Sequence, residues 1–90
     1  MKDFDSVFQA IGHRTRREIL IYLHKKERPL TSSEILARIS CSWPTLCQHL
    51  RKLERSGVMT QRKVGREVHY SLRKQRLVGV VKTWICAFDD

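Results

Sequence analysis

The stretch from Ser42 to Gly57 limits the fold of this chain more than any other part of its sequence. Leu46, Leu50 and Leu53 recur at spacings of four and three, so they fall on one side of a helix. Ser42 is a favoured N-cap residue, and glycine at position 57 is typical of a left-handed helix end. The sequence therefore predicts one amphipathic helix with well-defined ends between these two residues.

The opposite face of this helix carries long hydrogen-bond donors, a hydroxyl and an aromatic ring, without any acidic side chain. Its members are Trp43, Thr45, Gln48, Arg51, Lys52 and Arg55. Glutamine pairs with adenine edges and arginine with guanine, and cationic side chains also bind phosphate. The face therefore favours contact with a nucleic acid duplex, against the alternative of an ordinary solvated helix surface.

The expected role of each residue on this helix follows from its side chain. We expect Gln48 to contact a base, and Arg51 and Lys52 to contact phosphates more often than bases. Ser42 and Thr45 are short side chains that suit a phosphate or a thymine methyl.

Trp43 and His49 each have two interpretations. Trp43 either presses on the duplex or covers the first turn of the helix, and His49 either contacts the duplex or is buried and bridges neighbouring turns. Cys47 and His49 lie two residues apart, so their side chains diverge on a helix and cannot exchange a proton. Because 90 residues are also too few for an enclosed substrate cavity, we do not expect an enzyme.

Length and charge indicate a single small domain, 1–90, with a polyanionic partner. The 90 residues carry 18 Lys and Arg against 9 Asp and Glu, a formal net charge of +9, and the excess is concentrated between Arg51 and Arg76. A basic surface of this density favours nucleic acid, although it also keeps a small protein soluble. No apolar run approaches the roughly 18 residues of a membrane helix, and no signal peptide is evident. We therefore expect a cytoplasmic, nucleoid-associated protein with no membrane partner.

Apolar spacing predicts three shorter helices before the one described above. They cover residues 3–11, 15–26 and 31–39, with a connector at 27–30. Thr31 and Glu34 form a predicted capping box at the start of the third helix. Arg14, Arg16 and Arg17 crowd the first turn of the second helix, where the helix dipole disfavours cations. A nearby DNA phosphate would explain them, Arg16 above all, and so would solvent or an acidic neighbour.

After Gly57 the pattern changes to alternation, which predicts a β-hairpin over residues 58–72. Lys63 and Arg66 lie at its tip, where they suit a minor groove or the phosphate backbone, and a mobile, solvated tip is the alternative. A last helix carries an apolar stripe formed by Leu77, Val81, Trp84 and Phe88. This stripe is wider than so small a domain buries alone, which favours a dimer interface.

Three cysteines, Cys41, Cys47 and Cys86, form an odd set without a CxxC pair. This argues against a disulfide framework and against a zinc ribbon. A thiol on a cationic helix is prone to oxidation, so Cys47 and Cys86 are candidate redox sites. The alternative is that all three cysteines are inert small hydrophobic side chains.

The order of four helices, two strands and a last helix, together with several motifs, resembles the ArsR family of winged helix-turn-helix repressors. The motifs are Arg16-Arg17-Glu18-Ile19-Leu20, Leu46-Cys47-Gln48-His49-Leu50-Arg51-Lys52-Leu53, Ser56-Gly57-Val58 and Gly65-Arg66-Glu67-Val68-His69-Tyr70-Ser71-Leu72. The similarity covers nearly the whole chain and implies a mainly α fold with a small β-hairpin, of order ααααββα. The chain departs from the family at Cys47, where serine is usual, and at His13-Arg14, where Asp-Pro is usual.

The resemblance implies a homodimer joined through its first and last helices, with two recognition helices in successive major grooves of double-stranded DNA. The residues of that interface would be Phe4, Phe8, Leu77, Val81, Trp84 and Phe88. Many relatives release DNA on binding a metal or on thiol oxidation, but here Thr31, Ser32 and Ser33 stand where thiolate ligands would lie. We therefore expect a repressor of an inverted-repeat operator without metal or cofactor, and leave any small-molecule or metal inducer open. A winged-helix adaptor that binds an acidic protein is the alternative function.

Overall fold

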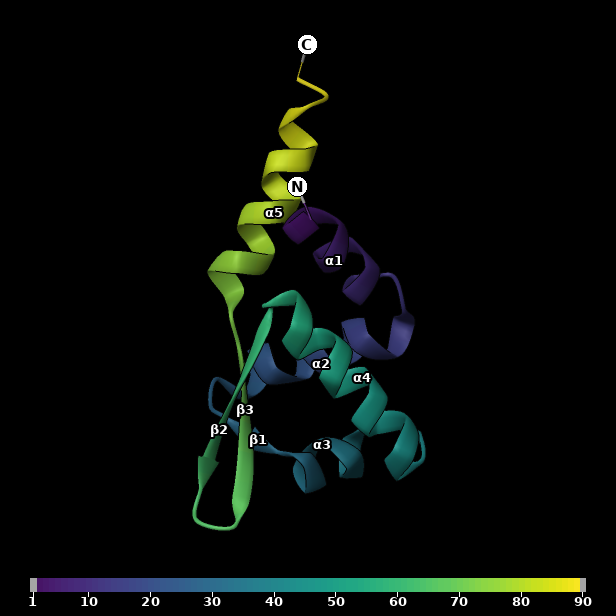
Figure 1. Cartoon of the computed structure of the whole chain (residues 1–90), viewed down its shortest axis with the longest axis vertical. Coiled ribbons are helices and arrows are strands. Elements are labelled where there is room, and N and C mark those ends of the chain that lie inside the picture. Colours follow the sequence, from purple (N-terminus) through teal and green to yellow (C-terminus); the bar gives the residue numbers. More distant parts are fainter. Residues whose placement is uncertain (1, 90) are drawn as a thin grey trace.

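Five helices and three short strands make up residues 2–89, which are the residues that the computed structural model describes. In chain order they are α1 (Lys2–Ile11), α2 (Arg14–Lys26), β1 (Leu30–Thr31), α3 (Ser32–Arg38), α4 (Trp43–Ser56), β2 (Met59–Val64), β3 (Glu67–Leu72) and α5 (Lys74–Cys86). The molecule is elongated, 49 × 24 × 23 Å, with α5 projecting from one end and the β2–β3 hairpin from the other (Figure 1). All five predicted helices and the hairpin are confirmed. Among the described residues, none of the helices is long and apolar enough to cross a membrane.

The sheet has one strand more than the sequence predicted. β1 and β2 both pair antiparallel with β3, which gives the strand order β1-β3-β2. Leu30 lies opposite Tyr70, and Met59 lies opposite Leu72. The expectation of a plain connector at 27–30 was therefore wrong at Leu30. A strand of two residues is too short to show alternation, and this one is held in place because Leu30 is fully buried.

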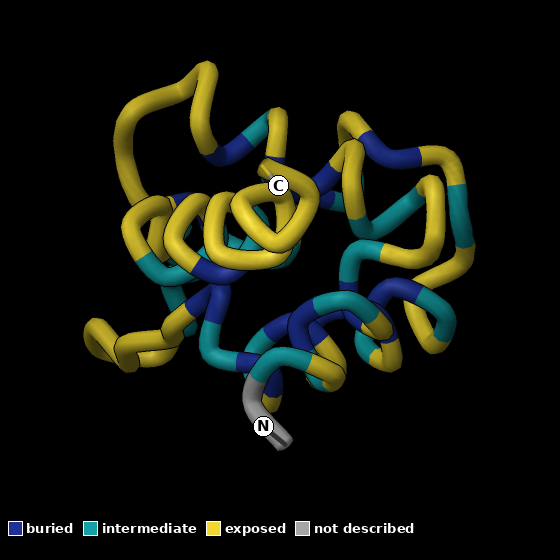
Figure 2. The backbone as a smooth tube through the Cα atoms, turned by 90° about the horizontal axis from the view of Figure 1, so that it is seen from above, coloured by how far each residue is buried: buried dark blue, intermediate teal, exposed yellow. Residues whose placement is uncertain are grey.

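One hydrophobic core, to which every helix contributes, holds these elements together. Its buried residues are Val7, Ala10, Ile19, Leu20, Leu23, Leu30, Ile35, Ile39, Leu46, Leu50, Leu53, Val58, Met59 and Val80. Figure 2 shows these buried stretches between the helices, whereas most of the α5 tube is exposed. Within α5 only Val80 is buried. The core therefore holds the first four helices more firmly than it holds the C-terminal helix α5.

Side-chain caps set the ends of α3 and α4. The Thr31 hydroxyl accepts a hydrogen bond from the Glu34 N–H (3.2 Å), and the Glu34 carboxylate accepts one from the Thr31 N–H (3.0 Å), which confirms the capping box. Arg28 donates to the same carboxylate at 2.7 Å, and this bond is the main reason that the pKa of Glu34 falls to about 2. Ser42 caps α4, and Gly57 ends it in the left-handed conformation with φ 84°.

The C-terminus of α1 is capped by arginine side chains of α2. Arg16 Nε donates to the Ala10 carbonyl (2.6 Å), and Arg17 Nη1 donates to the Ile11 carbonyl (2.9 Å). The last carbonyls of a helix lack partners and carry partial negative charge, so they attract cations. Arg14 instead pairs with Glu18 at 3.1 Å on the surface. The arginines at the start of α2 therefore have partners within the chain.

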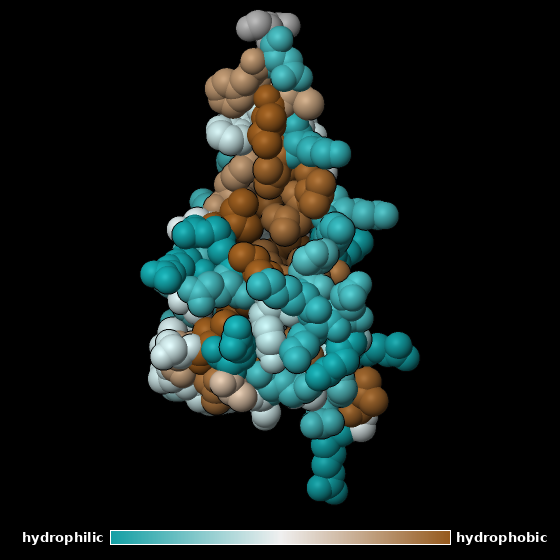
Figure 3. Space-filling model, turned by 180° about the vertical axis from the view of Figure 1, so that it is seen from behind, coloured by the Kyte–Doolittle hydropathy of each residue, from teal (hydrophilic) through white to brown (hydrophobic). Residues whose placement is uncertain are grey.

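The apolar stripe of α5 is largely uncovered. Trp84 is 52% exposed and Phe88 69% exposed, and hydrophobic side chains gather along this part of the molecule in Figure 3. The expectation that Phe88 lies on the last helix was wrong, because α5 ends at Cys86 and the chain turns there. Ring contacts nevertheless keep Phe88 on the stripe: Trp84 packs edge-on against it (centroids 5.2 Å apart) and against Phe8 (5.5 Å).

Replacing Glu27 with glycine is expected to stabilise the protein. Glu27 ends α2 in the left-handed conformation, with φ 53°, and its N–H donates to the Leu23 carbonyl. A residue with a Cβ loses roughly 1–2 kcal/mol in this conformation, and glycine's greater unfolded-state freedom offsets part of that. We expect a net gain of up to about 1 kcal/mol in the free energy of unfolding, measured by urea denaturation. Glu27→Ala, which keeps the Cβ, should show no gain; equal effects of the two substitutions would contradict this explanation.

Candidate nucleic-acid interface

α4 lies with one face in the core and the other in solvent. Leu46, Leu50 and Leu53 are buried against α1, α2 and β2, which pack on this side of the helix. α3 precedes α4 by a short turn, so the two helices form the predicted helix-turn-helix. The outer face exposes Gln48, Arg51, Lys52 and Arg55, in the arrangement that the sequence predicted.

The first turn of α4 is ordered by its own hydroxyls. Ser42 Oγ accepts a hydrogen bond from the Thr45 N–H (3.4 Å) and donates one to Thr45 Oγ1 (2.9 Å). Each hydroxyl keeps further bonding capacity, because an oxygen has two lone pairs. Trp43 is 48% exposed beside them, so the structure places its ring neither fully in solvent nor fully over the turn.

A cleft of about 390 Å³ separates the exposed face of α4 from α1. It is lined by Ser6 and Gln9 of α1 and by Gln48, Arg51, Lys52, Arg55 and Ser56 of α4. None of the ion pairs among residues 2–89 involves the three cations of this cleft, and none of its lining residues is acidic. The cleft therefore offers amide and hydroxyl groups beside three cations without a counterion, which is a setting suited to a phosphate.

The β2–β3 hairpin places two further cations at the far end of the molecule (Figure 1). Lys63 and Arg66 lie close to Gly65, whose φ of 64° makes the turn, and both are exposed. A groove of about 340 Å³ runs between this wing and the start of α4. Trp43, Cys47, Arg66 and Tyr70 are among the residues that line it. Burial raises the pKa of Tyr70, and nearby carboxylate and thiol groups raise it further.

Three comparisons with known proteins agree with this geometry. A family model described as a helix-turn-helix domain matches residues 11–62. The chain is 34% identical over 68 residues to the transcriptional repressor SdpR of Bacillus subtilis (strain 168). This match covers 76% of this chain and 73% of SdpR. The structure of an ArsR-like transcriptional regulator from Rhodococcus sp. RHA1 superposes with a TM-score of 0.80 at 30% identity, covering 91% of this chain and 76% of that one.

The chain belongs to the ArsR family. It is a transcriptional regulator with a winged helix-turn-helix DNA-binding fold, and it is not an enzyme. A homodimeric winged helix-turn-helix DNA-binding domain from Mycobacterium bovis, described as a possible ArsR-family regulator, is also similar, with a TM-score of 0.76. It covers 96% of this chain and 79% of that chain at 17% identity, which shows the fold alone.

Two residues predicted to contact DNA, His49 and Arg16, make contacts within the protein. His49 is only 8% exposed, which favours the buried interpretation of its side chain. The Arg16 guanidinium, expected at a phosphate, donates to the Ala10 and Gln9 carbonyls and lies 3.1 Å from His49 Nδ1. Spacing along the sequence could not reveal this, because the partners come from α1, α2 and α4.

The C-terminus of α4 is tied to α5 in this family member. Arg76 donates from Nε (3.3 Å) and Nη2 (3.2 Å) to the Ser56 carbonyl, where a cation suits the helix dipole. The Arg76 side chain covers Gly57, and a Cβ built there would lie 2.9 Å from Arg76 Nε. Glycine at this position is thus needed for its left-handed conformation, whereas a Cβ would displace only the flexible side chain of Arg76.

The remaining predicted sites are spread over the molecule. Cys47 is half-buried in the groove beside the wing, and Cys86 is exposed at the end of α5, so their redox role stays a prediction. Within residues 2–89, no group of three or more His, Cys, Asp and Glu side chains is placed to hold a metal ion. Phe4 and Phe8 pack half-buried against the core from α1, while Leu77 and Val81 of α5 line an apolar groove with α2.

The contribution of α1 to the cleft beside α4 was not predicted from the sequence. Ser6 and Gln9 line the cleft beside α4, but only the apolar residues of α1 entered the periodicity argument. The polar residues of α1 were the available signal, but their position beside α4 depends on how α1 packs and cannot be read from the sequence. His13 was also missed: its ring caps α2 by accepting from the Thr15 N–H at 3.1 Å.

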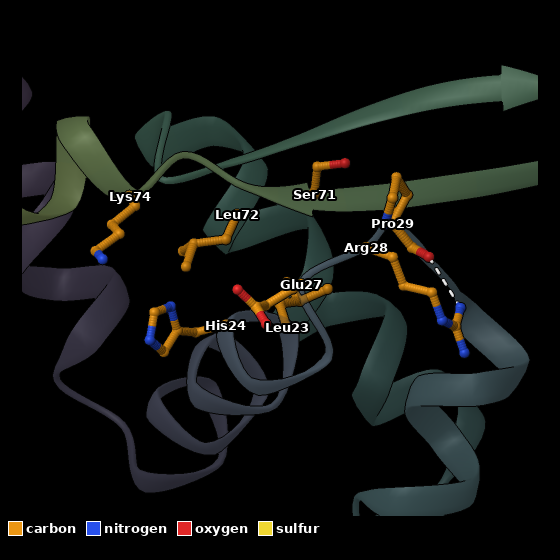
Figure 4. Close-up of a pocket in the computed structure, with 8 residues that line it drawn as sticks. All are labelled: Leu23, His24, Glu27, Arg28, Pro29, Ser71, Leu72 and Lys74. Atoms are coloured by element: carbon orange, nitrogen blue, oxygen red, sulfur yellow. Dashed lines mark hydrogen bonds between the residues drawn. The ribbon is translucent and has the colours of Figure 1, made fainter.

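Another pocket, of about 400 Å³, lies away from this interface (Figure 4). Its eight lining residues come from α2, the segment 27–29, the end of β3 and the start of α5. His24 and Lys74 face each other across its opening, and Arg28 donates to the Pro29 carbonyl at 3.2 Å beside it (Figure 4). The pocket shares no residue with α4, so a substitution of His24 should leave the α4 face unaltered.

Proposed function

We propose that two copies of this regulator bind an inverted-repeat operator in double-stranded DNA and repress transcription from it, in the cytoplasm with the nucleoid. Each α4 would enter one major groove, with half-sites about 34–36 Å apart, one helical turn of the duplex. The observation that carries the proposal is the exposed face of α4, where Gln48 is followed along the helix by three cations that form no ion pair within residues 2–89.

The chemistry of this face supports separate roles for its members. Gln48 has an amide that donates to and accepts from the edge of adenine in the major groove. Arg51, Lys52 and Arg55 line the cleft with α1, where Gln9 adds an amide, so a backbone phosphate seated there would receive several donors. Lys63 and Arg66 on the wing would follow the adjacent backbone or minor groove.

The apolar stripe of α5 supports the homodimer. Trp84 and Phe88 are more than half exposed, and Phe8 of α1 packs edge-on against Trp84, so one apolar surface joins the two terminal helices. Exposed apolar patches of this kind mark protein interfaces, and a second copy buries both at once by two-fold symmetry. The homodimeric state of the Mycobacterium bovis relative agrees with this arrangement.

Gln48→Ala is expected to weaken binding to the specific duplex by about 1–3 kcal/mol, roughly 5- to 150-fold, because one bidentate base contact is lost. Fluorescence anisotropy measures this with the duplex that the wild-type protein enriches from a random-sequence library. Binding to a shuffled duplex should be unchanged. Arg51→Ala is the matched variant: it should weaken both duplexes and lower the slope of log affinity against log salt by about 0.9.

The same titrations separate this proposal from the adaptor alternative. An adaptor that binds an acidic protein has no preferred duplex, and Gln48→Ala would leave its binding unaltered. If the random library yields no enriched sequence, or if the enriched and shuffled duplexes bind equally, the proposal of a sequence-specific repressor is wrong.

A further inference from the structure

A partly buried junction joins α4 to α1 and to the start of α2. Its centre is the ring of His49, 8% exposed, on the inner side of α4. Arg16 of α2 reaches this ring from Nη1 (3.1 Å), and its other nitrogens donate to the Ala10 and Gln9 carbonyls at the end of α1 (2.6 and 3.1 Å). One guanidinium thus links three helices.

The bond between Arg16 and His49 fixes the protonation of the histidine. A guanidinium only donates, so His49 Nδ1 must accept, and the ring must be neutral with its proton on Nε2. A protonated imidazole has no free lone pair and would point an N–H at a cation 3.1 Å away. The junction therefore closes only while His49 is uncharged.

A second histidine reinforces this requirement. The ring of His13 lies against that of His49, with centroids 4.6 Å apart. His13 Nδ1 accepts from the Thr15 N–H at the start of α2, so this cap also needs an unprotonated nitrogen. The two rings and Arg16 would place three positive charges together if both histidines were protonated.

Among the described residues, no carboxylate pairs with His49 to compensate a positive charge on its ring. From the start of α2 it faces Arg16 and His13, and from α1 the junction receives the carbonyls of Gln9 and Ala10, which Arg16 already occupies. Arg51 and Lys52, which follow His49 along α4, are exposed, and so are Arg62 and Lys63 of β2. Burial first, and then the charges of His13 and Arg16, lower the pKa of His49.

We propose that His49 and Arg16 are positioning residues that hold α4 in its DNA-binding orientation, and that protonation of His49 releases this hold. The inference rests on the proposed function, because α4 is taken as the DNA-binding helix. It assigns to Arg16 and His49 a role behind the interface instead of contact with DNA. The consequence is a regulator whose specific DNA binding weakens in acid.

The sign of this pH effect follows from linkage. A histidine whose pKa is lowered on folding binds fewer protons in the folded state than in the unfolded state below pH 6.5, its ordinary value. The contribution of the closed junction is therefore fully present above pH 6.5 and is lost as the pH falls below it. General electrostatics act in the opposite direction, since any gain of positive charge on the protein in acid strengthens its attraction to DNA.

The first test measures affinity for the library-enriched duplex between pH 7.5 and 5.5 at constant salt. Wild-type affinity should weaken by up to about tenfold. This is the largest effect that protonation of one histidine can have at pH 5.5 when its pKa is no higher than the ordinary 6.5. His49→Gln keeps an acceptor for Arg16 but cannot titrate, so its binding should hold or strengthen in acid. His24→Gln, the control on the far pocket, should behave as wild type.

The second test separates positioning by Arg16 from phosphate contact. Arg16→Met should destabilise the free protein toward urea, leave the salt slope of DNA binding unaltered and raise the pKa of His49 followed by NMR. Arg14→Met removes the same charge from the surface of the same helix and should change none of these. A salt slope that falls by about 0.9 in Arg16→Met, with unchanged stability, would assign Arg16 to a phosphate instead.

Two results overturn the inference without touching the proposed function. In the first, wild type and His49→Gln both bind specifically at neutral pH and lose the same amount of affinity in acid. In the second, the His49 resonance titrates at or above the ordinary pKa of histidine. Failure of the proposed function looks different, because no duplex is then preferred at any pH. The urea and NMR measurements on free protein still decide whether the junction exists.

Discussion

Leu53→Ala is expected to lower the free energy of unfolding by about 2–5 kcal/mol. Leu53 is fully buried on the inner face of α4, so its truncation leaves a cavity in the core that α1, α2 and β2 share with this helix. Domains of this size are stable by only about 5–15 kcal/mol, so the loss is a large fraction of the total. Urea denaturation followed by circular dichroism, at one fixed protein concentration, measures it.

Lys52→Ala is the matched control for this effect. Lys52 is the neighbour of Leu53 on the same helix, but it is exposed on the outer face, and such substitutions change stability by less than about 0.5 kcal/mol. The two variants should therefore separate the functions of the two faces, with Leu53→Ala losing stability and Lys52→Ala losing DNA affinity. A loss below about 1 kcal/mol for Leu53→Ala would mean that the core closes around the cavity.

The positions of the helices could be predicted because their ends depend on local chemistry. The Thr31–Glu34 capping box, Ser42 at the start of α4 and the left-handed Gly57 at its end each act within a few residues. Such local signals can be recognised in the sequence, and the structure confirms all three. The exposed face of α4 followed in the same way, since helical spacing alone separates Gln48 and Arg51 from the buried leucines.

The interior of the site could not be predicted, because its contacts join distant segments. Arg16 and His49 are 33 residues apart, and only the packing of α1 and α2 on α4 brings them together. From spacing alone, an arginine in a first helical turn indicates a phosphate as readily as a carbonyl at the end of another helix. Burial and hydrogen-bond partners decide between the two, and both are properties of the fold.

Trp84→Asp is expected to abolish the proposed dimer. The side chain at this position is half-exposed in the single chain, so a carboxylate there can reach water and the fold should survive. In a two-fold dimer the same charge would be buried twice without a partner, at a cost of at least about 3 kcal/mol, which weakens dimerisation more than roughly 100-fold. Sedimentation equilibrium at several protein concentrations measures the change.

The loss of the dimer should also lower the affinity for DNA, although α4 itself is unchanged. Two linked recognition helices bind an inverted repeat with an avidity about 10² to 10⁴ greater than one helix alone, so affinity for the full operator should fall by a similar factor. Affinity for a single half-site should stay as it was. Val64→Asp is the control, because Val64 is equally exposed, at 52%, but lies by the hairpin turn and should leave dimerisation unaltered. If Trp84→Asp sediments as the wild type does, the apolar stripe of α5 is not the dimer interface, and this part of the proposal is wrong.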